Sequence, residues 1–212
     1  MIRFENVVKS FNGRIVLNEI SLTIKKNEIV GLIGRSGAGK STMLRMISGL
    51  ALPDSGDVNV ESKKIGYIFQ EPYLMPWRTA LGNLYFTLRA MGLDKNAYRN
   101  IAMTWLDKME LKGFEQYYPG QLSGGMRQRV AIARAFSIDP DILLMDEPFS
   151  ALDSGLKGVM HSLMEKVLSE RPITILYVSH NPNEVARIAN RICTLTRDGR
   201  LEERRTAVVP CK

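Results

Sequence analysis

The spacing of hydrophobic and polar positions changes along the chain. Residues 2–8 alternate with a period close to two, and short apolar runs follow at residues 20–24 and 29–33. From Lys40 the spacing becomes helical, and the apolar positions on that face are Met43, Leu44, Met46 and Ile47. The first quarter of the chain therefore predicts strands followed by a buried helix.

The middle of the chain repeats at helical spacing. After an apolar strand at residues 65–69, apolar side chains recur three and four positions apart between Thr79 and Gly113. They are Leu81, Leu84, Tyr85, Leu88, Tyr98, Ile101, Ala102, Trp105 and Met109. A Pro-Gly pair at residues 119–120 breaks this repeat, and a further helix is expected at about residues 126–137.

The last third alternates short apolar runs with amphipathic segments. Strands are predicted at residues 142–145, 173–178 and 192–196, and helices at residues 156–168 and 184–189. This alternation is typical of a parallel sheet covered on both faces. We therefore expect an α/β core with a helical insertion at about residues 71–137, as one domain with two lobes.

The composition is that of an ordinary globular protein. Of 212 residues, 45% are hydrophobic and 24% charged, which excludes a disordered tail, a collagen-like fibre and a disulfide-stapled mini-protein. Two cysteines, Cys193 and Cys211, favour a reducing compartment. No apolar run approaches the roughly 20 residues of a membrane-spanning helix. The net charge of +7 fits nucleic acid, a membrane surface or a polyanion, and does not choose among them.

A glycine-rich segment follows the strand at residues 29–33. Residues 34–41, Gly-Arg-Ser-Gly-Ala-Gly-Lys-Ser, match the pattern G-x-x-x-x-G-K-[ST] between a strand and a helix. Its backbone N–H groups can surround an anion, Lys40 can reach the β- and γ-phosphates, and Ser41 can ligate Mg²⁺. The alternative is a plain glycine-rich turn that caps a helix. The motif predicts a nucleotide site.

Two carboxylates follow the strand at residues 142–145. Asp146 and Glu147 would lie at the carboxyl end of that strand, where open α/β sheets bind ligands. The first acid can hold Mg²⁺ through a water, and the second can take a proton from an attacking water. The alternative is a solvated strand end.

Ser123-Gly124-Gly125 precedes the helix expected at residues 126–137. A serine N-cap followed by glycines leaves several N–H groups exposed, which predicts a second anion site that completes the nucleotide pocket of another copy. The alternative is an ordinary capped helix. Met126 falls at the third helical position, so the reciprocal half of a capping box is missing.

These motifs together resemble the ATPase subunit of ATP-binding cassette (ABC) transporters. Residues 34–41, Gln70, residues 122–125, Asp146-Glu147, residues 150–153 and His180 occur in the order of that family, and the similarity covers about residues 1–200. The resemblance implies a P-loop NTPase parallel sheet core with N-terminal antiparallel strands and an inserted helical lobe. It implies one domain over residues 1–212, with its core at about 1–70 and 138–212 and its lobe at about 71–137.

The resemblance also implies roles for single residues. Phe11 matches the aromatic residue that stacks on adenine, Gln70 the glutamine that touches Mg²⁺ and the attacking water, Glu147 the base, and His180 the contact to the γ-phosphate. The implied catalytic residues are Lys40, Gln70, Glu147 and His180, and the implied Mg²⁺ ligands are Ser41, Gln70 and Asp146. The implied ATP contacts are Phe11, Gly34, Arg35, Ser36, Gly37, Ala38, Gly39, Lys40, Ser41, Thr42, Gln70, Ser123, Gly124, Gly125, Asp153 and His180.

One local pattern supports the placement of His180. Asn181, Pro182 and Glu184 predict an N-cap, a first-turn proline and a third-position glutamate, so the following helix would hold His180 in place.

The implied partners are a second copy and a separate membrane permease, on the cytoplasmic face of the membrane. Residues 71–79 are the expected permease contact, although Leu74, Met75 and Trp77 could instead pack the lobe. The run at residues 76–79 resembles importers of nitrate, sulfonates, taurine and pyrimidine precursors, which work with a solute-binding protein. An export subunit stays open.

Two other classes of protein share some of these motifs. A soluble ABC ATPase of ribosomes or DNA generally has two cassettes or a long coiled coil, whereas this chain has one cassette and no sustained heptads, so no nucleic acid is expected. An unrelated P-loop kinase or GTPase leaves residues 122–125 and His180 without a role.

Overall fold

The computed structural model describes residues 1–150, 152 and 154–204, which form two compact units. The first unit contains residues 1–65, 142–147 and the chain from Pro172 onward; the second contains residues 66–141 and 148–171. The domain division given by the resemblance stays a prediction.

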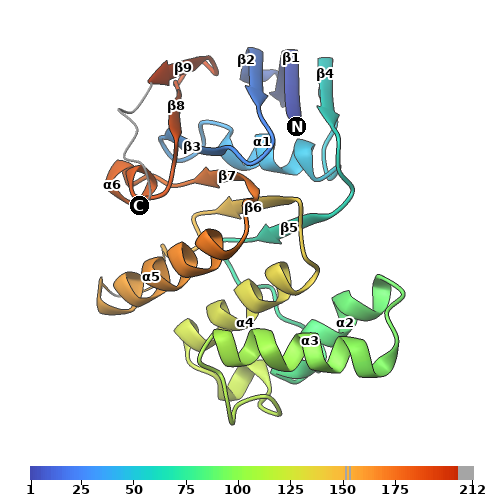
Figure 1. Ribbon diagram of the computed structural model, residues 1–212. Coiled ribbons are helices and arrows are strands. Elements are labelled where there is room, and N and C mark those ends of the chain that lie inside the picture. Colours follow the sequence, from blue (N-terminus) through green and yellow to red (C-terminus); the bar gives the residue numbers. More distant parts are fainter. Residues whose placement is uncertain (151, 153, 205–212) are drawn as a thin grey trace. The chain divides into compact units, whose positions relative to one another are not determined.

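A small antiparallel sheet opens the first unit. The strands β1 (Ile2–Phe11), β2 (Arg14–Ile24) and β4 (Ser55–Val60) lie in the order β2-β1-β4 (Figure 1). Asn12 and Gly13 both have positive φ, of 50° and 76°, which is the requirement of the two-residue turn that joins β1 to β2. The sequence pattern predicted β1 and β2 in part and missed β4, whose side chains are mostly exposed.

The larger sheet has six strands in the order β5-β6-β7-β3-β8-β9. They are β3 (Ile29–Gly34), β5 (Ile65–Ile68), β6 (Ile142–Asp146), β7 (Thr174–Val178), β8 (Arg191–Leu195) and β9 (Leu201–Arg204). β3 runs parallel to β7 and β8, β6 runs parallel to β7, and β9 runs antiparallel to β8. The predicted parallel core is thus confirmed, whereas β9 was not predicted.

Two helices of the first unit lie against the parallel strands. α1 (Lys40–Ile47) is the next element after β3, across a short loop, and it buries Met43, Leu44 and Ile47. The short helix α6 (Pro182–Ala186) approaches β3 at Gly31, where a Cβ would collide with the side chain of Val185. The helix predicted at residues 184–189 instead begins at Pro182 and ends at Ala186.

The second unit is mainly helical. Its helices are α2 (Ala80–Ala90), α3 (Lys95–Lys108), α4 (Gly124–Ser137) and α5 (Ser154–Glu170), with a short 3₁₀ helix, η1, at Pro119–Gln121. α2, α3 and α4 pack on one another (Figure 1), and Trp105 of α3 stacks on Phe136 of α4 with ring centroids 5.2 Å apart. None of the helices in the described part of the chain is long and apolar enough to cross a bilayer.

Candidate functional site

The glycine-rich loop turns between β3 and α1 as its sequence requires. Gly39 is the N-cap of α1 and has φ of 105°, a conformation that L side chains rarely adopt. A Cβ there would also lie 2.7 Å from Val16 Cγ1, so only glycine fits. The N-terminus of α1 thus opens onto the loop with backbone N–H groups available to an anion.

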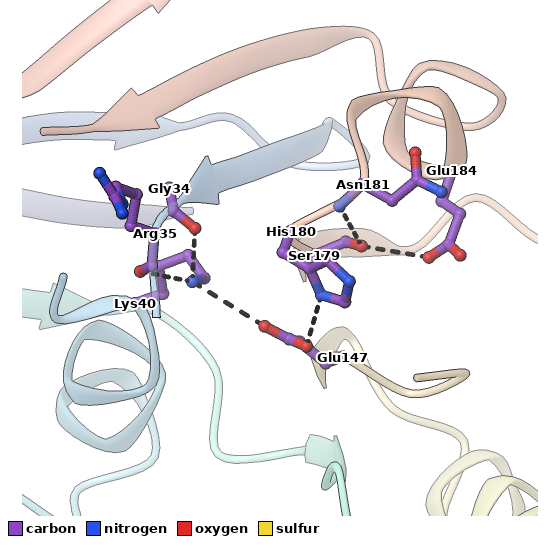
Figure 2. A network of polar contacts seen from close by, with 8 residues as sticks. All are labelled: Gly34, Arg35, Lys40, Glu147, Ser179, His180, Asn181 and Glu184. Carbon is purple, nitrogen blue, oxygen red and sulfur yellow. Dashed lines mark hydrogen bonds and ion pairs between the residues drawn. The ribbon is translucent and has the colours of Figure 1, made fainter. Parts of the chain in front are cut away.

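Lys40 folds its ammonium group back over this loop. Its Nζ donates to the carbonyl oxygens of Gly34 at 2.8 Å and Arg35 at 3.1 Å, and lies 3.9 Å from Glu147 Oε1 (Figure 2). The residue is only 5% exposed, and this burial lowers the pKa of Lys40, opposed by the charges of Glu147 and Asp146. A poorly hydrated cation at the mouth of an anion-binding loop favours a phosphate ligand.

Glu147 lies directly after β6 with a strained backbone. Its φ is 45°, an uncommon conformation for a residue with a side chain, while its N–H donates to Val178 O at 2.9 Å. Its side chain is 17% exposed, and Oε2 lies 2.8 Å from Nδ1 of His180. Glu147 therefore points toward both Lys40 and His180, which come from two other segments of the first unit (Figure 2).

The loop that carries His180 is held by polar contacts. Asn181 is the N-cap of α6 and accepts from Asn183 N–H at 3.0 Å, and Pro182 is the first helical residue, as expected. Glu184 is the third helical residue, as expected, and its carboxylate accepts the hydroxyl of Ser179 at 3.1 Å. This network of Ser179 and Glu184 was not predicted.

Asp146 and Ser41 form a second polar pair beside this cluster. Burial raises the pKa of Asp146, and the nearby Ser41 hydroxyl opposes this shift. The neighbouring charge of Glu147 acts in the same direction as burial, whereas Lys40 and Arg45 oppose it. A hydroxyl and a desolvated carboxylate are oxygen donors of the kind that Mg²⁺ prefers, so these residues fit a magnesium ion.

A pocket of about 350 Å³ lies next to the glycine-rich loop. Its lining residues are Arg14, Ile15, Val16, Arg35, Ser36, Gly37, Ala38 and Arg197. The lining includes three guanidinium groups and no carboxylate among the residues described, which favours a polyanionic ligand. Phe11 lies at the end of β1, opposite Arg14 in the β1–β2 pairing, and is 50% exposed. Arg35 was among the predicted ATP contacts, whereas Arg14 and Arg197 were not predicted, because single arginines carry no motif.

The other predicted anion site lies in the second unit, on α4. Ser123 is the N-cap of this helix, and its hydroxyl accepts from Met126 N–H at 3.2 Å. Gly125 packs under α5, because a Cβ there would collide with Leu156. Gln70, with Gly124, Pro72 and other residues of the same unit, lines a small cavity of about 80 Å³.

Residues 72–79 form a segment whose backbone is held by two polar side chains. The fully buried Asn83 accepts from Met75 N–H at 2.8 Å and donates to the carbonyl oxygens of Met75, Arg78 and Thr79. Arg134 donates to the carbonyl oxygens of Pro72 and Tyr73, at 3.0 and 2.9 Å. Leu74 and Met75 are half-buried, whereas Tyr73 and Trp77 remain 68% and 72% exposed.

The predicted residues are therefore distributed over both units. The first unit brings together residues 34–42, Asp146, Glu147 and His180, while Gln70 and residues 123–125 belong to the second unit. Asp153 lies outside the residues that the structure describes.

A protein family model described as ABC transporter matches residues 17–150, more than half of the chain. The chain belongs to the ABC transporter family. It is similar to an uncharacterized ABC transporter ATP-binding protein of Methanocaldococcus jannaschii, MJ0412, with 41% identity over 95% of this chain and 80% of that protein. It is 38% identical to the nitrate import ATP-binding protein NrtD of Synechocystis, over 92% of this chain and 77% of that protein.

A solved ABC structure has the same fold. The ATP-binding cassette MJ0796, in a dimeric post-hydrolysis state bound to ADP and Pi, superposes with a TM-score of 0.86 at 35% identity, covering 97% of this chain and 98% of that one. The expected α/β fold of an ABC ATPase is thus confirmed. As an ABC ATP-binding subunit, the chain is an ATPase coupled to transport.

Proposed function

We propose that this ABC ATPase is the motor of an importer for a small solute, and that it hydrolyses ATP at the cluster of Lys40, Glu147 and His180. The observation that carries the proposal is the convergence of these three side chains at the glycine-rich loop, with separations of 3.9 and 2.8 Å. Lys40 binds the β- and γ-phosphates, Glu147 takes the proton of the attacking water, and His180 contacts the γ-phosphate. The arginine-lined pocket takes the rest of the nucleotide, with Phe11 against the adenine.

Ser41 and Asp146 are the proposed protein ligands of Mg²⁺ in this first unit, and Gln70 of the second unit is the proposed third. When bound, the ion supplies charge neutralisation to the phosphates. The effect of the Ser41 hydroxyl on the pKa of Asp146 supports the fit, because it shows that the two oxygen donors are neighbours.

Changing Asp146 to Asn tests this magnesium site. Burial raises the pKa of Asp146 above its unfolded value. The ionised carboxylate therefore lowers the stability of the fold once the pH exceeds the unfolded pKa. At pH 7 and without metal, we expect Asp146→Asn to melt about 2 to 4 °C higher than the wild type. The same variant should need at least about tenfold more Mg²⁺ for ATP hydrolysis.

The control for this experiment is Asp57→Asn, which changes an exposed carboxylate of β4. It should alter neither the melting temperature nor the Mg²⁺ requirement. A lower melting temperature and an unchanged Mg²⁺ requirement in Asp146→Asn would together contradict the assignment.

The working form proposed here is a head-to-tail dimer. Ser123, Gly124 and Gly125 of one copy close over the nucleotide that the other copy holds at residues 34–42, and Asp153 lies at the same interface. The position of Ser123 and Gly124 at the N-terminus of α4 supports this role, since the first N–H groups of a helix have no partner within the helix and can bind an anion.

We further propose that residues 71–79 dock on a separate integral membrane permease, which places the chain at the cytoplasmic face of the membrane. The backbone clamp by Asn83 and Arg134 supports this, because it presents Tyr73 and Trp77 to the outside on a fixed segment. The transported solute is proposed to resemble nitrate, a sulfonate, taurine or a pyrimidine precursor, delivered by a solute-binding protein. The name of the nitrate import relative supports this class.

Replacing the exposed aromatic residues tests the docking segment. The chain would be co-expressed with the integral membrane protein encoded beside its gene. The double variant Tyr73→Ala/Trp77→Ala should lower the affinity of the complex about 30-fold, because exposed aromatic side chains dominate such interfaces. Met103→Ala, which shortens an exposed side chain of α3, is the matched control. If the wild type, the double variant and Met103→Ala all co-purify equally with the membrane protein, this segment is not the permease contact.

A further inference from the structure

The carboxylate of Glu184 joins the end of β7 to the first turn of α6. It accepts a hydrogen bond from the Ser179 hydroxyl at 3.1 Å, and its charge acts on the buried phenol of Tyr177. Tyr177 is fully buried and Ser179 is 1% exposed. Burial and the charge of Glu184 raise the pKa of Tyr177, which keeps the phenol protonated and able to donate. The Glu184 carboxylate therefore holds the hydroxyl of Ser179, the residue that precedes His180 (Figure 2).

Ser179 is the link between this carboxylate and His180. Its Oγ accepts from the N–H of Asn181 at 3.1 Å, which closes a tight turn around the single residue between them. Its own N–H donates to Leu32 O of β3 at 3.3 Å. A serine hydroxyl has one proton, and since that proton is donated to Glu184, a lone pair remains directed at Asn181.

The side chain of His180 depends on this turn for its position. Its side chain is 62% exposed, so packing does not hold the imidazole ring, and its polar contact is Nδ1 to Glu147 Oε2 at 2.8 Å. We propose that Glu184 is a positioning residue, which orients the Ser179 hydroxyl and thereby holds His180 within reach of Glu147 and the terminal phosphate. This inference rests on the proposed function, in which His180 contacts that phosphate.

Steady-state kinetics of Glu184 variants tests the effect on catalysis. Glu184→Ala removes both acceptors and should lower kcat at least about tenfold, with KM for ATP within about twofold, because only the reacting geometry is disturbed. Glu184→Gln keeps an acceptor for Ser179 and should stay within about fivefold of wild-type kcat. Asn183→Ala, an exposed change on the same turn of α6, is the control and should leave kcat unchanged. Unchanged kcat in Glu184→Ala would overturn the proposal.

NMR of the imidazole rings tests the mechanism without any turnover. The chain has two histidines, His161 and His180, so their ring signals can be assigned with one His180→Gln sample. Glu184→Ala should shift the ring signals of His180 and leave those of the buried His161 unchanged. Glu184→Gln should return the His180 signals to their wild-type positions. Unchanged chemical shifts of the His180 ring in Glu184→Ala would overturn the proposal. Normal turnover in His180→Ala would instead refute the proposed role of His180, which is a separate failure.

Discussion

Glu147→Gln should lower the rate of ATP hydrolysis at least about 100-fold while ATP still binds. The amide has the shape of the carboxylate, and it keeps an oxygen near Lys40 and a polar group near Nδ1 of His180. It cannot accept the proton of the attacking water, because the amide oxygen is a very weak base. Single-turnover kinetics with MgATP measures the rate of the chemical step directly, and an equilibrium binding experiment measures the affinity for ATP.

The same variant should also accumulate as an ATP-bound dimer. If hydrolysis opens the dimer, a chain that binds but does not cleave ATP stays paired, and size-exclusion chromatography with MgATP should show twice the mass. Glu202→Gln changes an exposed carboxylate of β9 and is the matched control, expected to behave as the wild type. Turnover of Glu147→Gln within about threefold of the control would remove Glu147 from the role of base.

The elements that sequence pattern predicted are those that bury their own hydrophobic residues. β6 and β7 are almost entirely buried and were predicted from their apolar runs. β4 and β9 were missed, because β4 is mostly polar and exposed and β9 carries three charged residues in four. Their strand conformation comes from pairing with a neighbouring strand. β4 pairs with β1, which is distant in sequence, and β9 pairs with β8 across a turn.

The candidate site shows the same division. The glycine-rich loop, Asp146, Glu147 and Ser123 were predictable, because each motif is local and its backbone geometry follows from its own residues. Asn83 and the pair of Ser179 and Glu184 were not, since no sequence motif specifies these contacts, although the partners lie within eight residues along the chain. For Glu184 the local pattern predicted its position in the helix but not its partner. It is the third residue of α6 as expected, and its carboxylate accepts the Ser179 hydroxyl.

Ser123→Arg should leave ATP binding by the single chain intact and abolish hydrolysis that depends on the dimer. The loop of Lys40 belongs to the first unit, so a change on α4 of the second unit leaves its phosphate contacts in place. In the proposed dimer, Ser123 faces the nucleotide of the other copy, and a long cationic side chain there would prevent closure. We expect no MgATP-induced dimer by size-exclusion chromatography and a turnover at least about 100-fold below wild type.

Two controls separate this effect from the loss of a helix cap. Ser123→Ala also removes the acceptor for Met126 N–H, at a cost of about 1 kcal/mol, but it leaves room for the partner copy. Asp94→Arg adds the same side chain at the N-cap of α3, where Asp94 accepts from Asn96 and Ala97 N–H. Both controls should still pair and hydrolyse ATP. If Ser123→Arg does so as well, the α4 terminus is no part of a shared nucleotide site, since no closed dimer could accommodate an arginine against the bound triphosphate.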